Sequence, residues 1–199
     1  MNTIKKLFII LGPTASGKTS LSLQIAKELK TEIVSCDSRQ FYKELKIGTA
    51  PPSPEELKNT KHHFIQHLSI KENYNTGKYE EDAICKISSL FKKYDNLILV
   101  GGSGLYINAI CNGLDDIPQI PQKIRDKINN EFLEKGIGWL QEKVKEIDID
   151  FYQKSDANNP QRLKRYLEIH TYTGKKISSF YRKEKIKRDF KIIKIGIST

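Results

Sequence analysis

Residues 12–19 read GPTASGKT and match the pattern G-x-x-x-x-G-K-[ST] at every fixed position. The apolar run Lys6–Leu11 precedes the match, and apolar residues at helical spacing follow it as far as Leu29. The motif therefore falls between a buried strand and a helix. In that setting, the backbone N–H groups of the glycine-rich turn and of the helix N-terminus face phosphate oxygens. The stretch predicts a P-loop that binds a diphosphate or triphosphate.

The motif also assigns chemistry to single residues. Lys18 supplies a mobile cation, and the Thr19 hydroxyl can hold Mg²⁺, which bridges phosphate oxygens. We expect Mg²⁺ as the cofactor, and we expect the diphosphate- or nucleotide-binding site to consist of Gly12, Pro13, Thr14, Ala15, Ser16, Gly17, Lys18 and Thr19. The alternative is a chance match in an ordinary strand–turn–helix, and the flanking pattern argues against it.

A second short strand is predicted at residues 32–36, directly before Asp37. The strand–helix–strand spacing indicates a parallel sheet, in which the carboxyl ends of the strands carry the chemistry. The next buried run, residues 97–100, ends in Gly101–Gly104 without the acid that holds magnesium in many P-loop NTPases. Asp37 is therefore a candidate for organising the metal or acting as a base. A surface helix cap is the alternative for this carboxylate.

The region between these strands is less regular. Ser53 and Glu56 have the spacing of a helix cap, and an amphipathic helix is predicted over residues 79–91. The stretch HHFIQH at 62–67 invites a zinc interpretation. No Cys or acid lies nearby at ligand spacing, and the interleaved Phe64 and Ile65 favour a strand or core edge instead.

The pattern changes after Gly113. Pro118 and Pro121 mark a boundary, and amphipathic helical patterns follow until an alternating strand pattern at 190–197. The predicted fold is α/β: a P-loop NTPase-like parallel sheet flanked by helices, with an inserted all-helical subdomain. We assign residues 1–114 to the P-loop core, 115–187 to a basic helical insertion, and 188–199 to a strand that returns to the core.

Net charge is +10, and residues 161–194 carry +9 of it, with twelve Lys or Arg against three Asp or Glu. A concentrated basic segment indicates a nucleic-acid partner. Composition alone leaves a solvated lysine-rich surface equally open. A helix predicted from Gln161 places Arg162, Lys164 and Arg165 in its first turns, where cations oppose the helix dipole. An external anion such as RNA phosphate would explain them.

Other features exclude several classes of protein. The longest apolar run has about six residues, too short to span a membrane. The first strand begins so early that we expect no signal peptide. Cys36, Cys85 and Cys111 lie far apart without C-x-x-C spacing, which indicates reduced thiols. We expect a cytoplasmic monomer without membrane contact.

Four motifs together resemble the tRNA dimethylallyltransferases, also called tRNA isopentenyltransferases. They are GPTASGKT at 12–19; SCDSRQ-Y at 35–42 with IGTA-P at 47–51; LVGGSGLY at 99–106; and NNPQRLKRYLE at 158–168 with TGK at 173–175. Their order and spacing match the family over nearly the whole chain. The second and fourth motifs are more specific than the P-loop.

The resemblance implies transfer of the dimethylallyl group from dimethylallyl diphosphate to N6 of the adenine 3′ to the anticodon, in tRNAs that read codons beginning with U. The P-loop then holds the diphosphate where relatives of the fold hold ATP, and ATP binding stays open. Asp37 becomes the general base, with Lys18 and Thr19 as further catalytic residues. The implied contacts to the tRNA anticodon loop are Asp37, Ser38, Arg39, Gln40, Ser103, Arg125, Gln161, Arg162, Leu163, Lys164 and Arg165.

The sequence departs from the family pattern at three places. Ser103 stands where many members have Thr, and Tyr166 stands where many have Ala. Family members also continue beyond the point corresponding to Thr199, so we expect a fragment or a natural truncation. Two other functions stay open: a small-molecule P-loop kinase, which would have a short arginine-bearing lid instead of a long basic insertion, and a non-catalytic RNA-binding remnant.

Overall fold

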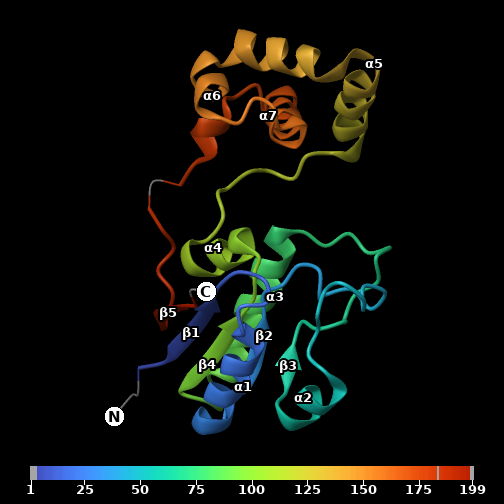
Figure 1. Cartoon of the computed structure of the whole chain (residues 1–199). Helices are drawn as coiled ribbons and strands as arrows, with labels where there is room; N and C mark the ends of the chain where they lie inside the picture. The colour runs from blue at the N-terminus through green and yellow to red at the C-terminus, as the bar shows by residue number, and fades with distance from the viewer. Residues whose placement is uncertain (1–3, 183, 198–199) are drawn as a thin grey trace. The chain divides into compact units, whose positions relative to one another are not determined.

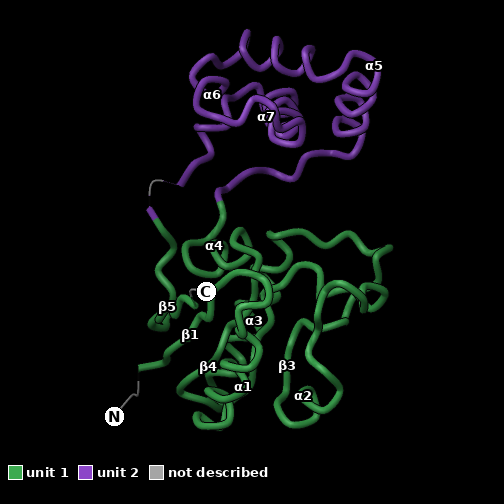
Figure 2. Tube along the Cα trace, viewed as in Figure 1, with its two compact units in different colours: residues 1–114, 185–199 green, residues 115–184 purple. Residues whose placement is uncertain are grey.

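The structure, a computed structural model, describes residues 4–182 and 184–197. It divides into two compact units (Figure 2). Residues 1–114 and 185–199 form one, here called the P-loop unit, and residues 115–184 form the other, the helical unit. No helix among the described residues is long and apolar enough to cross a membrane.

A five-stranded sheet with the order β3-β2-β4-β1-β5 forms the centre of the P-loop unit (Figure 1). All of its strand pairs are parallel, which confirms the predicted parallel sheet. The strand expected near residues 190–197 is present as β5 and pairs with β1 from Lys6↔Lys191 to Leu11↔Gly196. The strand bounds are β1 Lys6–Leu11, β2 Ile33–Ser35, β3 His62–His63, β4 Asn96–Val100 and β5 Lys191–Gly196.

Alternate residues of the central strands face opposite sides of this sheet. Leu7, Ile9, Val34, Leu97 and Leu99 pack in one core cluster with α3 (Thr76–Leu90) and α4 (Gly104–Asn112). On the opposite side, a second cluster joins the sheet to α1 (Lys18–Leu29) through Ile10, Ala26, Ile33 and Ile98. Because both faces are covered, the strands read as continuous apolar runs in the sequence.

One more helix, α2 (Pro54–Asn59), lies between β2 and β3. Its capping box is formed as the sequence predicts: Glu56 N donates to Ser53 Oγ, and Ser53 N donates to Glu56 Oε2. The chain continues from this helix directly into β3, so His62 and His63 lie at the edge of the sheet.

The helical unit contains α5 (Gln122–Ile147), α6 (Ile149–Lys154), α7 (Pro160–Thr173) and the 3₁₀ helix η1 (Ile177–Phe180). Gly136, at φ 74° and ψ −173°, breaks α5 into two segments. A separate core holds the unit together, with Ile128, Leu140, Val144, Leu163 and Tyr166 among its buried members. Tyr166, the departure from the family pattern, is fully buried and packs on Phe151 with ring centroids 4.4 Å apart.

Candidate active site and basic pocket

The P-loop connects β1 to α1 and curls through positive φ angles. Ala15 has φ 64° and Gly17 has φ 83°, a region that glycine enters without steric cost. Ser16 N donates to Pro13 O at 3.3 Å, and Lys18 Nζ folds back to donate to the same carbonyl. Ser16 Oγ is buried without a hydrogen-bond partner among the described residues. The loop thus holds a hydroxyl and an ammonium that a phosphate group could engage.

Helix α1 begins at Lys18 with Gly17 as its N-cap, and no side chain of the described residues caps this end. An uncapped helix N-terminus directs N–H groups and the positive end of its dipole outward. This geometry favours an anion and agrees with the phosphate-binding prediction for residues 12–19.

A small cavity of about 40 Å³ lies beside the P-loop. Lys18, Thr19 and Asp37, the predicted catalytic residues, all line it, so strands and loops distant in sequence converge at one place. The complete lining is Lys18, Thr19, Ser22, Ser35, Asp37, Gln40, Pro52, His62, Ile65, Val100 and Gly101.

Asp37 follows β2 and is half-buried. Its Oδ1 accepts a hydrogen bond from Arg39 N at 3.0 Å, and its carbonyl accepts one from Gln40 N at 3.1 Å. The carboxylate therefore caps a turn and does not cap a helix. Asp37 also lines the cavity, so the turn holds its backbone at the same cavity as Lys18 and Thr19.

The glycine-rich loop after β4 packs directly against this turn. A Cβ at Gly101 would lie 2.2 Å from Cys36 O, so only glycine fits there. Ser103 Oγ accepts a hydrogen bond from Ser38 N at 3.0 Å and donates one to Ser38 Oγ at 3.0 Å. Ser103 and Ser38, both predicted tRNA contacts, are thus bonded to each other, and the hydroxyl is the feature of Ser103 that the loop uses.

The oxygen donors of the cavity suit a hard cation such as Mg²⁺. Lys18 and Thr19 begin α1, and both residues line the cavity. The partnerless Ser16 Oγ adds a further oxygen in the adjacent loop. The residues therefore fit a magnesium ion held at Thr19 together with phosphate oxygens.

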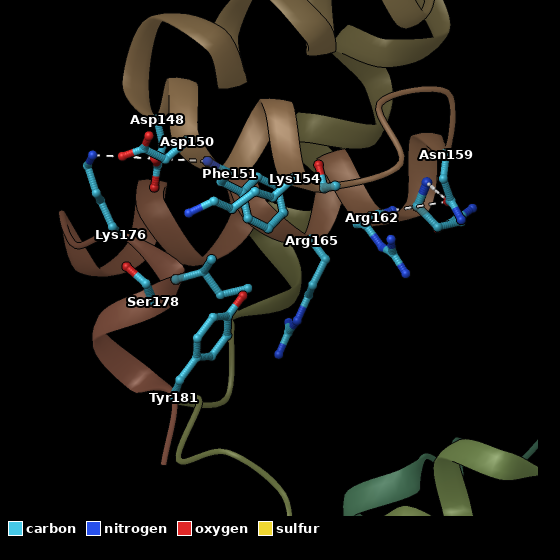
Figure 3. Close-up of a pocket in the computed structure, with 13 residues that line it drawn as sticks. Asp148, Asp150, Phe151, Lys154, Asn159, Arg162, Arg165, Lys176, Ser178 and Tyr181 are labelled. Carbon is cyan, nitrogen blue, oxygen red and sulfur yellow. Dashed lines mark hydrogen bonds and ion pairs between the residues drawn. The ribbon is translucent and has the colours of Figure 1, made fainter. Parts of the chain in front are cut away.

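The helical unit has its own pocket, of about 830 Å³ (Figure 3). Four cations line it, from Lys154, Arg162, Arg165 and Lys176, against two carboxylates, so the pocket is basic. The complete lining is Asp148, Asp150, Phe151, Lys154, Ser155, Asn159, Gln161, Arg162, Arg165, Lys176, Ile177, Ser178 and Tyr181.

Helix α7 divides the predicted tRNA contacts at 161–165 into two groups. Gln161, Arg162 and Arg165 line the basic pocket, and Figure 3 shows both arginines extending from α7 into the open space beside Tyr181. Leu163, by contrast, is fully buried in the core. Lys164 Nζ donates to Asn129 Oδ1 at 3.0 Å and lies 5.0 Å from the Phe132 ring centroid.

The start of α7 is fixed by Asn159, whose Oδ1 accepts from Gln161 N and Arg162 N at 3.1 and 3.2 Å. The first turns of this helix therefore carry the cations that the sequence predicts to oppose the dipole. Arg125, the predicted contact of the helical unit outside α7, lies on α5, and its Nε is 4.0 Å from Glu168 Oε2. The same carboxylate oxygen accepts from Arg165 Nη1 at 3.3 Å.

Sequence reasoning missed Asp148, a residue that lines the basic pocket and is only 4% exposed. Phe151 N and Tyr166 Oη donate to it at 3.1 and 3.2 Å, and Lys176 Nζ lies 3.4 Å away. Burial raises the pKa of Asp148, but these three partners outweigh burial and leave the pKa below its ordinary value. The spacing Asp148 to Phe151, typical of a helix cap, was the available signal.

The fold and these two sites define a class: a P-loop α/β protein whose helical unit carries a basic pocket. A family model described as IPP transferase matches residues 40–199. The chain belongs to this family.

Two curated relatives illustrate the similarity. The tRNA dimethylallyltransferase of Christiangramia forsetii is 52% identical over 191 residues, which are 96% of this chain and 63% of the relative. That of Flavobacterium psychrophilum is 49% identical over 197 residues, 96% of this chain and 64% of the relative. The chain thus spans slightly less than two thirds of the length of these relatives.

Two solved structures are also similar. A eukaryotic dimethylallyltransferase acting on tRNA superposes with a TM-score of 0.80 at 27% identity, covering 97% of this chain and 48% of that one. The tRNA isopentenylpyrophosphate transferase of Bacillus halodurans gives a TM-score of 0.54 at 34% identity, covering 85% and 56%. These similarities support the same fold for this chain.

Proposed function

We propose that this chain transfers the dimethylallyl group of dimethylallyl diphosphate to N6 of the adenine 3′ to the anticodon of tRNA. Lys18, Thr19 and Asp37 line one cavity beside the P-loop, and this observation supports the proposal most directly. Family membership supplies the reaction class. Reduced cysteines, two of them buried, are consistent with a cytoplasmic enzyme.

In the proposed reaction, the C–O bond between the dimethylallyl carbon and the diphosphate breaks as the adenine amine attacks that carbon. The P-loop N–H groups and Lys18 stabilise the charge that develops on the departing diphosphate. Mg²⁺ held at Thr19 supplies further charge neutralisation when it is bound. Asp37 accepts the proton that the amine loses on forming the new C–N bond.

The helical unit provides the proposed RNA affinity. Arg162 and Arg165 line a basic pocket of about 830 Å³ with the aromatic side chains of Phe151 and Tyr181. Cations that meet phosphates and rings that meet unstacked bases are the usual elements of single-stranded RNA recognition. The adenine must also leave its stack to react, as in other enzymes that modify a base.

Transfer of labelled dimethylallyl to an anticodon stem-loop, with adenine 3′ to the anticodon, tests this function. The proposal predicts labelling that requires Mg²⁺ and is lost when guanine replaces that adenine. Labelling of the guanine control would show that the dimethylallyl group is transferred to a different position of the RNA. RNA binding without transfer would favour a non-catalytic RNA-binding protein, and phosphorylation of a small acceptor with ATP would favour a kinase.

A further inference from the structure

Two aromatic side chains line the basic pocket of the helical unit, and they differ in what else they contact (Figure 3). The ring centroids of Phe151 and Tyr166 are 4.4 Å apart, so Phe151 belongs to the core of this unit. Tyr181 is 49% exposed. Among residues 4–182 and 184–197, its ring has no aromatic or cation–π contact and its hydroxyl has no hydrogen bond. Tyr181 therefore offers an aromatic face that no other ring or cation covers.

The fold fixes where this ring lies. Tyr181 follows the 3₁₀ helix η1, and its N–H donates to Ser178 O at 3.3 Å. Two side chains hold η1 on the core of the unit: Ile177 is only 9% exposed, and Phe180 packs against the same cluster. The backbone of Tyr181 is thus anchored on its N-terminal side. A ring whose position is set before binding loses little conformational entropy when a ligand stacks on it.

The cations of the pocket fall into two groups. Lys176 Nζ lies 3.4 Å from the Asp148 carboxylate, and Arg165 Nη1 lies 3.3 Å from a carboxylate of α7. The guanidinium of Arg162 and the ammonium of Lys154 form no hydrogen bond or ion pair with any residue that the structure describes. Two positive charges of the pocket therefore have no partner within this part of the chain.

The pocket suits an anion that carries a flat ring. Its two unpaired cations outnumber its one unpaired carboxylate, that of Asp150, in the described part of the helical unit. Burial raises the pKa of Tyr181, so the phenol is neutral at physiological pH and adds no negative charge. The volume of about 830 Å³ lies in the range of about 300–1,000 Å³ that encloses ligands of small-molecule size. A single nucleotide, with its phosphate and its base, meets all of these conditions.

We infer that Tyr181 is the stacking platform for one unstacked nucleotide of the tRNA anticodon loop, whose phosphate meets Arg162. This nucleotide is not the adenine that reacts, because no residue lines both the basic pocket and the cavity at Asp37. Stacking uses the face of a base, so Tyr181 contributes affinity and takes no part in the bond-forming step. The inference rests on the proposed function, because it assigns a second nucleotide of the same RNA substrate.

Three variants of the intact chain test the platform through affinity for the anticodon stem-loop. Tyr181→Leu removes the ring and should raise Kd about five- to 100-fold. Tyr181→Phe keeps the ring and should bind within about threefold of the wild type. Tyr172→Leu is the matched control, because Tyr172 is 47% exposed on α7 and does not line the pocket. Equal Kd in Tyr181→Leu and the wild type, or an equal loss of affinity in Tyr172→Leu, would overturn the inference.

The salt dependence of binding separates stacking from charge. Tyr181→Leu removes no charge, so its slope of log K against log salt should equal that of the wild type. Arg162→Gln removes one cation and should reduce the slope by about 0.7. A reduced slope in Tyr181→Leu would show that the substitution disturbs phosphate contacts and would count against a stacked base.

A scan of the RNA identifies the nucleotide and separates this inference from the proposed function. Each loop nucleotide is replaced in turn by an abasic one, and Kd is measured for the wild type and for Tyr181→Leu. At one position other than the reacting adenine, the abasic RNA should bind the wild type weakly and cost Tyr181→Leu no further affinity. Losses that add at every position would overturn the platform, whether or not the chain transfers dimethylallyl. Coupling at one position without any transfer would instead overturn the proposed function and leave the platform in place.

Discussion

The two units place their candidate functional groups in different ways. In the P-loop unit the backbone sets the positions: Gly17 lies at positive φ, and Gly101 packs directly on Cys36 O. In the helical unit, long side chains such as Arg162 and Arg165 extend from one regular helix. We therefore expect a substitution of a few atoms in the P-loop unit to abolish dimethylallyl transfer or to destabilise the fold. In the helical unit, we expect even the reversal of a charge to change RNA affinity only by a graded amount.

The largest expected effect is on catalysis at Asp37. Asp37→Asn keeps the size of the side chain but removes the proposed base, so kcat should fall by about 10²–10⁴-fold. Affinity for the stem-loop should change little, since Arg162 and Arg165, the cations proposed to meet RNA phosphates, are unchanged. Asp95→Asn is the matched control, because Asp95 pairs with Lys5 at 2.9 Å and does not line the cavity. Near-normal kcat in Asp37→Asn would show that another group takes the proton.

The next effect is on the stability of the P-loop unit. Gly101→Ala would place a Cβ 2.2 Å from Cys36 O, and a backbone atom cannot move away cheaply. We expect the free energy of unfolding to fall by about 3 kcal/mol. Gly104→Ala, three residues later, meets no atom of the described residues within 4 Å and should be neutral or stabilising by up to about 1 kcal/mol. Urea denaturation measures the free energy of unfolding of both variants. Equal values would contradict the close packing of Gly101 against Cys36 O.

A graded effect is expected in the helical unit. Arg162→Glu and Arg165→Glu should each weaken stem-loop binding and reduce the slope of log K against log salt by about 0.7 for each lost phosphate contact. Lys164→Glu changes the charge equally, but Lys164 is held by Asn129 and Phe132 and does not line the pocket. Its salt slope should stay close to that of the wild type. If Lys164→Glu instead lowers the salt slope as much as Arg162→Glu and Arg165→Glu do, the slope depends only on net charge and the pocket has no special role in binding RNA.

Much of the P-loop unit could be predicted from the sequence, because its elements leave local patterns. Buried strands give apolar runs, the P-loop has fixed spacing, and parallel pairing brings Asp37 to the P-loop edge. The partners of side chains could not be predicted in this way. The contacts of Asp148 with Tyr166 and Lys176 join residues that are 18 and 28 positions apart in the sequence. The periodicity of a helix or a strand does not predict such contacts.

The same limit applies to the candidate sites. The motif at 161–165 names five tRNA contacts, but the spacing of Leu163, Tyr166 and Leu167 already indicates an apolar helix face. The structure shows that Leu163 lies on this face. For His62, the sequence offers only a pair of histidines. In the structure its Nδ1 lies 2.8 Å from Thr60 O and the residue lines the cavity beside the P-loop, and neither contact leaves a local pattern in the sequence.

The smallest effect concerns Glu168, which lies near both Arg125 and Arg165. The two arginine side chains are 43% and 39% exposed, so solvent screens the pairs, and Glu168→Gln should cost no more than about 1 kcal/mol of stability. Stem-loop affinity should change less than in Arg165→Glu, because both cations remain. In a double-mutant cycle with Arg165→Gln, strong coupling in RNA affinity would show that Glu168 positions this arginine. The helical unit would then resemble the P-loop unit in depending on fixed geometry, whereas additivity would support a site that acts chiefly through charge.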